Sequence, residues 1–222
     1  MSQRQIPLMF VCAMSLMLFF SAVINAQELN ASDVLNRRTR ATEIRGKSIP
    51  SLLSTISDLY DIPIGVELGD PIVTPERKID LIVPETSLRL LLDTMISKDR
   101  RYVWKLESGV IHLLPTQRDP VIAAFLNTRI SHFAFAEGTS KNKIMADILA
   151  LPEIRAQMMS AGVKYTFFEE WPSPESSVKV SIDESNLTLA ELLDKIVLGS
   201  NLKQWLVSRI TTGHDEFIAL QI

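Results

Sequence analysis

Two kinds of apolar pattern follow each other twice along this chain. Apolar and polar residues alternate over 79–83 and again over 178–182, which is typical of half-buried strands. Each run is followed by a leucine-rich segment, at 87–96 and at 188–197. The spacing of these leucines places them on one face of a helix. The chain therefore predicts a strand followed by an amphipathic helix in two places.

The two leucine-rich segments are copies of one pattern. They align without a gap, and continuing the alignment brings Trp104 onto Trp205. Leucines match in any pair of amphipathic helices, whereas the chain has three tryptophans in all. The matched helix positions are Leu88 with Leu189, Leu91 with Leu192, Leu92 with Leu193 and Asp93 with Asp194. We infer an internal repeat, and we expect each tryptophan to pack on the leucines of its own copy.

Each copy ends in a predicted β-hairpin. The first spans 102–114 with Gly109 in its turn, and the second spans 203–222 with Gly213 in its turn. Glycine readily adopts the positive φ that tight hairpin turns need. Both closing segments are therefore expected to be pairs of antiparallel strands.

The front half of each copy predicts a helix and a further strand. In the first copy, a helix over 48–59 leads to a strand over 62–68. In the second, a helix over 139–149 is followed by an insertion at 152–162, which predicts a second short helix before the strand at 163–168. The insertion makes the second copy the divergent one.

This order of elements predicts an α/β fold of the α+β type. Two tandem small units of order β-α-β-β-α-β-β are expected to follow a signal peptide. Each unit is expected to contain a mixed sheet, because each of its helices has one apolar stripe to bury against a sheet. The predicted divisions are a signal peptide at 1–26, an N-terminal linker at 27–39, a first unit at 40–115, a connecting helix at 116–129 and a second unit at 130–222.

The N-terminal segment has the pattern of a secretion signal. Arg4 precedes an apolar run over 6–20, and a small-residue cleavage site ends at Ala26. The run is short for a membrane span, which takes about 20 apolar residues. The alternative is an uncleaved anchor, because Ile24 is a mediocre residue for the cleavage site. We expect export to the periplasm, where the chain is free or associated with the outer membrane.

Composition and motifs narrow the function classes. The one cysteine, Cys12, lies inside the signal segment, so a mature chain has no disulfide and depends on apolar burial. A net charge of −3 gives no electrostatic signature of nucleic-acid binding. His112, His132 and His214 share no metal-ligand spacing, and no phosphate-binding glycine motif is present. We therefore assign no catalytic, cofactor-binding or metal-binding residues, and we expect no small-molecule substrate.

The first copy resembles a known family of small domains. The segment from Thr42 through 62–66 and then 78–115, closing with the hairpin after Trp104, resembles the short N-terminal domain of secretins and TonB-dependent receptors, the STN or secretin N0-like domain. The resemblance covers about 40–115 and, more weakly, 130–222. It rests on patterns of apolar positions.

The resemblance implies a periplasmic domain that recognises other proteins. In that family the partners are other rings or inner-membrane proteins in secretins, and anti-sigma regulators in transducing receptors. No long β-rich segment follows the second copy in this sequence, so we expect a stand-alone interaction module, acting as an adaptor or as an assembly or signalling component of the cell envelope. Self-association is a further expectation.

One loop has the composition of a contact site. Glu169 and Glu170 precede Trp171 in a proline-rich stretch, and tryptophan is favoured at binding hot spots. We predict that these three residues contact the protein partner; the alternative is that Trp171 folds back over the core. Two other functions stay open, an exported enzyme with its site in the cleft between the units and a subunit that forms rings or filaments through its sheet edges.

Overall fold

The computed structural model describes residues 33–68, 77–167, 177–200 and 202–222. The predicted signal peptide at 1–26 lies outside these residues, and so do Glu169, Glu170 and Trp171. The cleavage site and the predicted contact loop therefore stay predictions.

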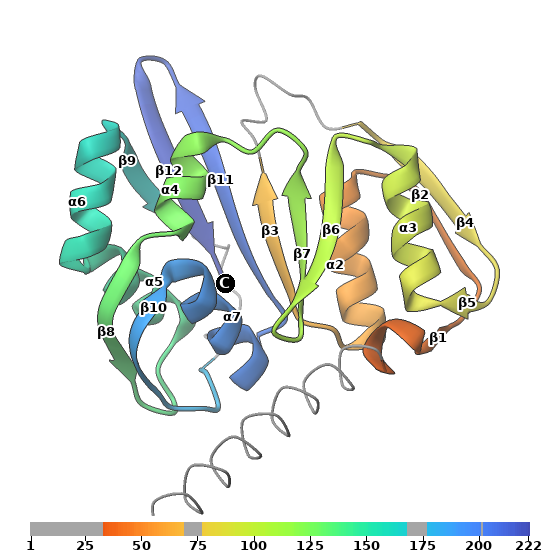
Figure 1. The fold of residues 1–222 in the computed structure, drawn as a ribbon, viewed down its shortest axis with the longest axis horizontal. Helices are drawn as coiled ribbons and strands as arrows, with labels where there is room; N and C mark the ends of the chain where they lie inside the picture. Colours follow the sequence, from red (N-terminus) through yellow and green to blue (C-terminus); the bar gives the residue numbers. More distant parts are fainter. Residues whose placement is uncertain (1–32, 69–76, 168–176, 201) are drawn as a thin grey trace, which may run out of the picture.

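The first unit follows the predicted order of strands and helices (Figure 1). Its elements are β2 (Thr42–Lys47), α2 (Ile49–Tyr60), β3 (Ile64–Leu68), β4 (Ile79–Val83), α3 (Leu88–Lys98), β6 (Tyr102–Glu107) and β7 (Val110–Pro115). Two short strands, β1 (Arg38–Thr39) and β5 (Thr86–Ser87), pair with each other at its margin. The helix and hairpin predicted from the first copy are confirmed.

Local sequence explains where these elements begin and turn. Ser48 is the N-cap of α2, its hydroxyl accepts a hydrogen bond from the Ser51 amide, and Pro50 lies in the first turn, where no amide hydrogen is needed. Between β6 and β7, Ser108 and Gly109 have φ values of 49° and 88°. Positive φ at both central residues is what a two-residue hairpin turn of type I′ requires.

The second unit repeats the scheme with one added helix. The connecting helix α4 (Pro120–Leu126) leads to β8 (Arg129–Phe135), α5 (Lys141–Ala150), α6 (Pro152–Ala161), β9 (Lys164–Phe167), β10 (Ile182–Thr188), α7 (Leu189–Gly199), β11 (Gln204–Thr212) and β12 (Asp215–Gln221). The insertion predicted at 152–162 is helix α6, which ends at Gly162 in the left-handed region. The α+β class is confirmed.

The strand predicted at 178–182 is wrong in its position. Val178 is buried, and its backbone bonds to the loop at Gly138 and Thr139. The strand, β10, begins only at Ile182 and pairs with β8. The alternating apolar residues before it are used to hold this loop against the core, which the period of two does not distinguish from a strand.

The two units join into one six-stranded sheet with the order β6-β7-β3-β11-β12-β9 (Figure 1). Each unit contributes an antiparallel hairpin and a third strand parallel to the hairpin's second strand. The units meet where β3 pairs in parallel with β11. Each unit also has a separate two-stranded ribbon, β2 with β4 and β8 with β10.

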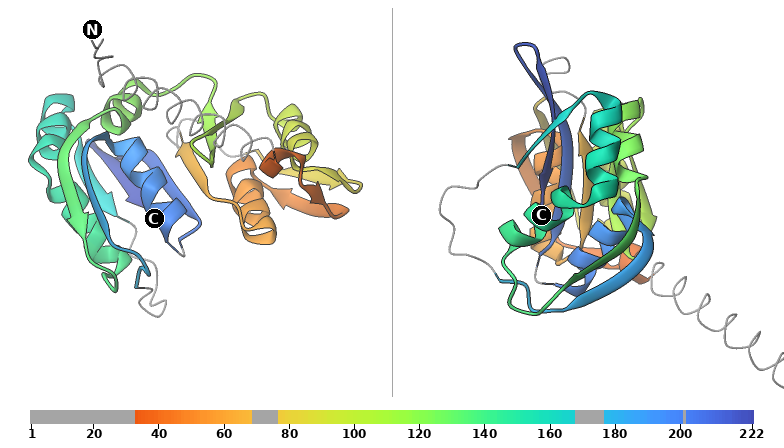
Figure 2. Two further views of the ribbon diagram at one scale, coloured as in Figure 1. Left: turned by 60° about the horizontal axis from the view of Figure 1, so that its bottom comes forward. Right: turned by 90° about the vertical axis from the view of Figure 1, so that its left-hand side faces the viewer.

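The hydrophobic cores of the two units lie on opposite faces of the large sheet. On β3, Ile64 and Val66 belong to the core of the first unit, while Gly65 between them lies under Trp205 of the second core. Because successive side chains of a strand point to opposite faces, the shared strands feed both cores. The same alternation on β7 sends Ile111 to the first core and Val110 to the second. In each unit two helices, α2 and α3 in the first and α6 and α7 in the second, contact both the large sheet and the unit's own ribbon (Figures 1 and 2).

Candidate interface at the sheet edges

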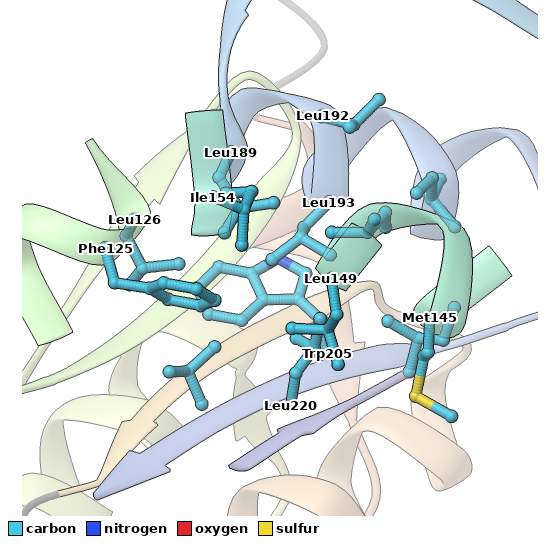
Figure 3. Close-up of a cluster of buried hydrophobic side chains, with 14 of the residues drawn as sticks. Phe125, Leu126, Met145, Leu149, Ile154, Leu189, Leu192, Leu193, Trp205 and Leu220 are labelled. Carbon is cyan, nitrogen blue, oxygen red and sulfur yellow. The ribbon is translucent and has the colours of Figure 1, made fainter. Parts of the chain in front are cut away.

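The junction between the units is closed by Trp205. Its side chain is fully buried, and Figure 3 shows the indole among side chains of the second core: Phe125, Leu149, Ile154, Leu189 and Leu193. A Cβ atom added at Gly65 would lie 2.3 Å from Cζ2 of Trp205. Strand β3 therefore passes beside the indole only because position 65 has no side chain.

The sequence repeat extends to one hydrogen bond. Nε1 of Trp205 donates to Oδ1 of Asp194 over 2.8 Å, and Nε1 of Trp104 donates to Oδ1 of Asp93 over 2.9 Å. Each tryptophan packs against the core of its own unit, as predicted. They differ in cover, because Trp205 is fully buried whereas Trp104 is half-buried, with the Arg89 guanidinium 5.9 Å from its ring centroid.

A buried polar group crosses the junction. Nε2 of His112, on β7 of the first unit, lies 3.1 Å from Oδ2 of Asp194, on α7 of the second, in a contact that lacks hydrogen-bond geometry. The imidazole also meets the Trp205 ring edge-on, with centroids 5.6 Å apart. The two polar side chains are only 5% and 10% exposed. Both are therefore packed inside the junction between the units.

Ion pairs tie the connecting helix to the same junction. Arg118 makes two hydrogen bonds to the buried carboxylate of Glu67 on β3, at 2.5 and 2.9 Å. Arg209 on β11 donates to Asp119, the N-cap of α4, and to Glu216 on β12. These two carboxylates, Glu216 first, raise the pKa of the Arg209 guanidinium. Contacts from both units therefore hold α4 in place.

The large sheet ends in two open edges. Within the described residues, β6 pairs only with β7, and β9 pairs only with β12. An unpaired edge presents a row of backbone N–H and C=O groups, to which another strand can add. The two edges of the large sheet are therefore backbone surfaces to which another strand can add, as are the sides of the two-stranded ribbons that no described strand pairs with.

An apolar groove runs beside the β9 edge. It has a volume of about 310 Å³ and is lined by Arg155, Met158, Met159, Val163, Lys164 and Tyr165. Met159 on α6 is 82% exposed and Tyr165 on β9 is 46% exposed. At the opposite edge Val103 on β6 is 44% exposed. Exposed apolar side chains thus accompany both open strands.

A larger hollow of about 800 Å³ lies near the end of α3. Its lining includes Arg77, Lys98, Arg100 and Arg101 around the buried Asp99. Hydrogen bonds from the Arg101 guanidinium hold the pKa of the Asp99 carboxyl below its usual value. One of the four cations is thus already paired, and the others form an exposed basic surface.

A hollow of about 380 Å³ also lies at the junction, where the enzyme alternative places its site. Its charged residues are Asp61 and Lys203, which form an ion pair at 3.2 Å. The described carboxyls with displaced pKa lie elsewhere. Hydrogen bonds from Ser131 lower the pKa of Glu153, and the Thr188 amide lowers that of Glu191.

The three histidines lie in different environments. His112 is buried in the junction, His132 is exposed beside Ser185 and Asp183, and His214 is exposed in the β11–β12 turn. Within the described ranges, no three His, Cys, Asp or Glu side chains gather in a way that would hold a metal ion.

Met159 and Tyr165 were not predicted as contact residues from the sequence. The residues that were predicted, Glu169, Glu170 and Trp171, lie outside the described part of the chain. Tyr165 lies on β9, four residues before Glu169, and Met159 lies on α6 before that strand. A signal for Met159 was present in the insertion at 152–162, whose polar helix contains the adjacent apolar residues Met158 and Met159.

Comparisons with known proteins found no matching family model, no matching curated protein and no matching solved structure. Within the part of the chain that the structure describes, no helix has the length and apolar character of a membrane span.

Proposed function

We propose that this chain is an exported, non-catalytic protein-binding module that works in the periplasm as an adaptor or assembly component of the cell envelope. The observation that supports the proposal most is the open β9 edge with the apolar groove beside it. The resemblance to short N-terminal domains of secretins and TonB-dependent receptors points to the same class of function.

The edge and the groove suit the binding of an extended segment. Backbone groups of an added strand bond to the edge, and side chains of that strand reach pockets alongside it, so that affinity and specificity come from different parts of the surface. Met159 and Tyr165 provide the apolar part of such a surface next to β9. Exposed apolar side chains gathered in one place are typical of interaction sites.

A binding experiment with matched variants tests the proposal. The mature chain is immobilised and exposed to envelope extract of the host, in wild-type form and as Met159→Lys and Ile82→Lys. Both substituted side chains are exposed, at 82% and 61%, but Ile82 lies on β4, outside the large sheet. We expect Met159→Lys to lose most of the captured partner and Ile82→Lys to keep it. Equal capture by all three forms would show that the β9 edge does not bind the partner.

Export has its own test. Intact-mass measurement on protein from the native host is expected to find an N-terminus at Gln27 in the periplasmic fraction, because the cleavage pattern ends at Ala26. Recovery of the uncleaved chain in a membrane fraction would contradict this part of the proposal.

A further inference from the structure

We propose that the partner of the β9 edge is a second copy of this chain, joined head to tail through parallel pairing of β9 with β6. The inference rests on the proposed function, because it names the partner of the same edge. Its basis is the junction already present within one molecule.

The internal junction joins the same two kinds of strand. Strand β11 is the first strand of the second hairpin, as β6 is of the first hairpin. Strand β9 pairs in parallel with the second strand of its unit's hairpin, as β3 does in the first unit. Strands β3 and β11 pair in parallel over five positions, from Ile64 with Gln204 to Leu68 with Ser208. Placing β6 of a second copy beside β9 repeats this step with the equivalent strands.

The state of the two tryptophans supports the same joint. Trp205 on β11 is fully buried among side chains of its own core, and Gly65 on β3 of the neighbouring unit lies against its indole. Trp104 keeps the matching hydrogen bond to Asp93 but is half-buried, and β6 has no described strand on its outer side. Addition of β9 from a second copy places a strand beside Trp104 as β3 lies beside Trp205, although Lys164–Phe167 contains no glycine, so the close fit of Trp205 over Gly65 is not repeated there.

The charges on the two edges do not oppose pairing. Lysines on an exposed edge usually discourage strand addition. Here Nζ of Lys105 on β6 lies 2.6 Å from the Glu107 carboxylate, and Nζ of Lys164 on β9 lies 2.8 Å from the Asp215 carboxylate. Each edge lysine is thus accompanied by an acidic partner of its own unit.

The joint uses two different surfaces, so it does not close on itself as a twofold dimer does. A contact of this heterologous kind leaves one β6 edge and one β9 edge free at the ends, and it extends into rings or open filaments. This property separates the proposal from any symmetric dimer through a single edge.

Sedimentation velocity over a wide concentration range tests it, using the mature chain as wild type, Val103→Lys, Met159→Lys and Ile82→Lys. We expect the mass of wild type and of Ile82→Lys to rise with concentration beyond that of a dimer. Each edge variant alone is expected to remain a single chain. An equimolar mixture of the two edge variants is expected to form dimers and nothing larger, because each variant keeps the edge that the other lacks. Circular dichroism confirms that the variants are folded.

Several results would overturn the inference. A wild-type chain that stays monomeric at all concentrations excludes the joint, and a Met159→Lys chain that still dimerises points to symmetric pairing through β6. If the chain is monomeric while capture of a different envelope protein still depends on Met159, the self-association fails and the proposed function stands. If capture is also independent of Met159, both fail.

Discussion

At the scale of single residues, the two tryptophans show what the junction adds to one copy of the repeat. Both donate a hydrogen bond to an aspartate on the preceding helix, and only Trp205 is enclosed. We expect Trp205→Ala to lower the free energy of unfolding by about 3–5 kcal/mol, as truncation of a buried aromatic does. Trp104→Ala is expected to cost less, because its side chain is already partly in water. Chemical denaturation of both variants measures the difference, and equal losses would contradict the different burial of the two rings.

Gly65 is the residue on which the close approach of the two units depends. A methyl group there overlaps the Trp205 indole, and overpacking of this kind costs about 1–3 kcal/mol. We expect Gly65→Ala to lower the melting temperature. Gly199→Ala is the matched control, because an added Cβ there would meet its nearest neighbour at an ordinary 3.6 Å. A Gly65→Ala protein as stable as the Gly199→Ala protein would mean that the strands separate freely at the junction.

At the scale of elements, α7 begins with a complete capping box. The Thr188 hydroxyl accepts from the Glu191 amide, and the Glu191 carboxylate accepts from the Thr188 amide. Loss of the threonine cap in Thr188→Ala is expected to cost about 1 kcal/mol. Thr188→Ser keeps the hydroxyl and is expected to remain close to wild type. Thermal melts of the two variants at neutral pH compare them directly, and equal losses would mean that the hydroxyl is not the stabilising group.

The same box gives the helix a dependence on pH. Hydrogen bonds from Thr188 lower the pKa of the Glu191 carboxyl in the folded chain from its reference value of 4.5. The stabilisation is therefore present above the reference value and is lost as the pH falls through the lowered folded value. Glu191→Gln is expected to remove this part of the acid sensitivity, so its stability relative to wild type improves as the medium becomes acidic. A constant difference between the two proteins across that range would contradict the coupling.

Local sequence patterns predicted the helices and strands themselves better than they predicted which strands pair with one another. The helix at 48–59, both hairpins and the helix in the insertion are encoded by spacing, caps and turn residues within a few positions of one another. The error at 178–182 arose because apolar alternation also suits a buried loop. Pairing of β3 with β11 joins residues far apart in sequence, such as Ile64 and Gln204, and no local period specifies a partner. Because that pairing was not predictable, the two edges that remain open were not predictable either.

At the scale of the whole molecule, the units are parts of one folded body. The β3–β11 pairing, the Trp205 packing and the His112–Asp194 contact all cross between them. We expect one cooperative unfolding transition, with coincident curves from tryptophan fluorescence and far-ultraviolet circular dichroism. Two separated transitions would show that the units are stable independently. The fragments 37–115 and 128–222 are expected to be less stable than the whole chain, because each leaves its half of the junction exposed.

The account as a whole depends on the two open edges, and hydrogen–deuterium exchange tests them most directly. Exchange is measured on the mature chain at low and high protein concentration. We expect the amides of β6 (102–107) and β9 (164–167) to gain protection as concentration rises, because strand addition bonds their outward-facing N–H groups. The ribbon of β8 and β10 lies outside the large sheet and is expected to exchange equally at both concentrations. Equal exchange of β6 and β9 at all concentrations, under conditions where the chain is folded, would contradict the account.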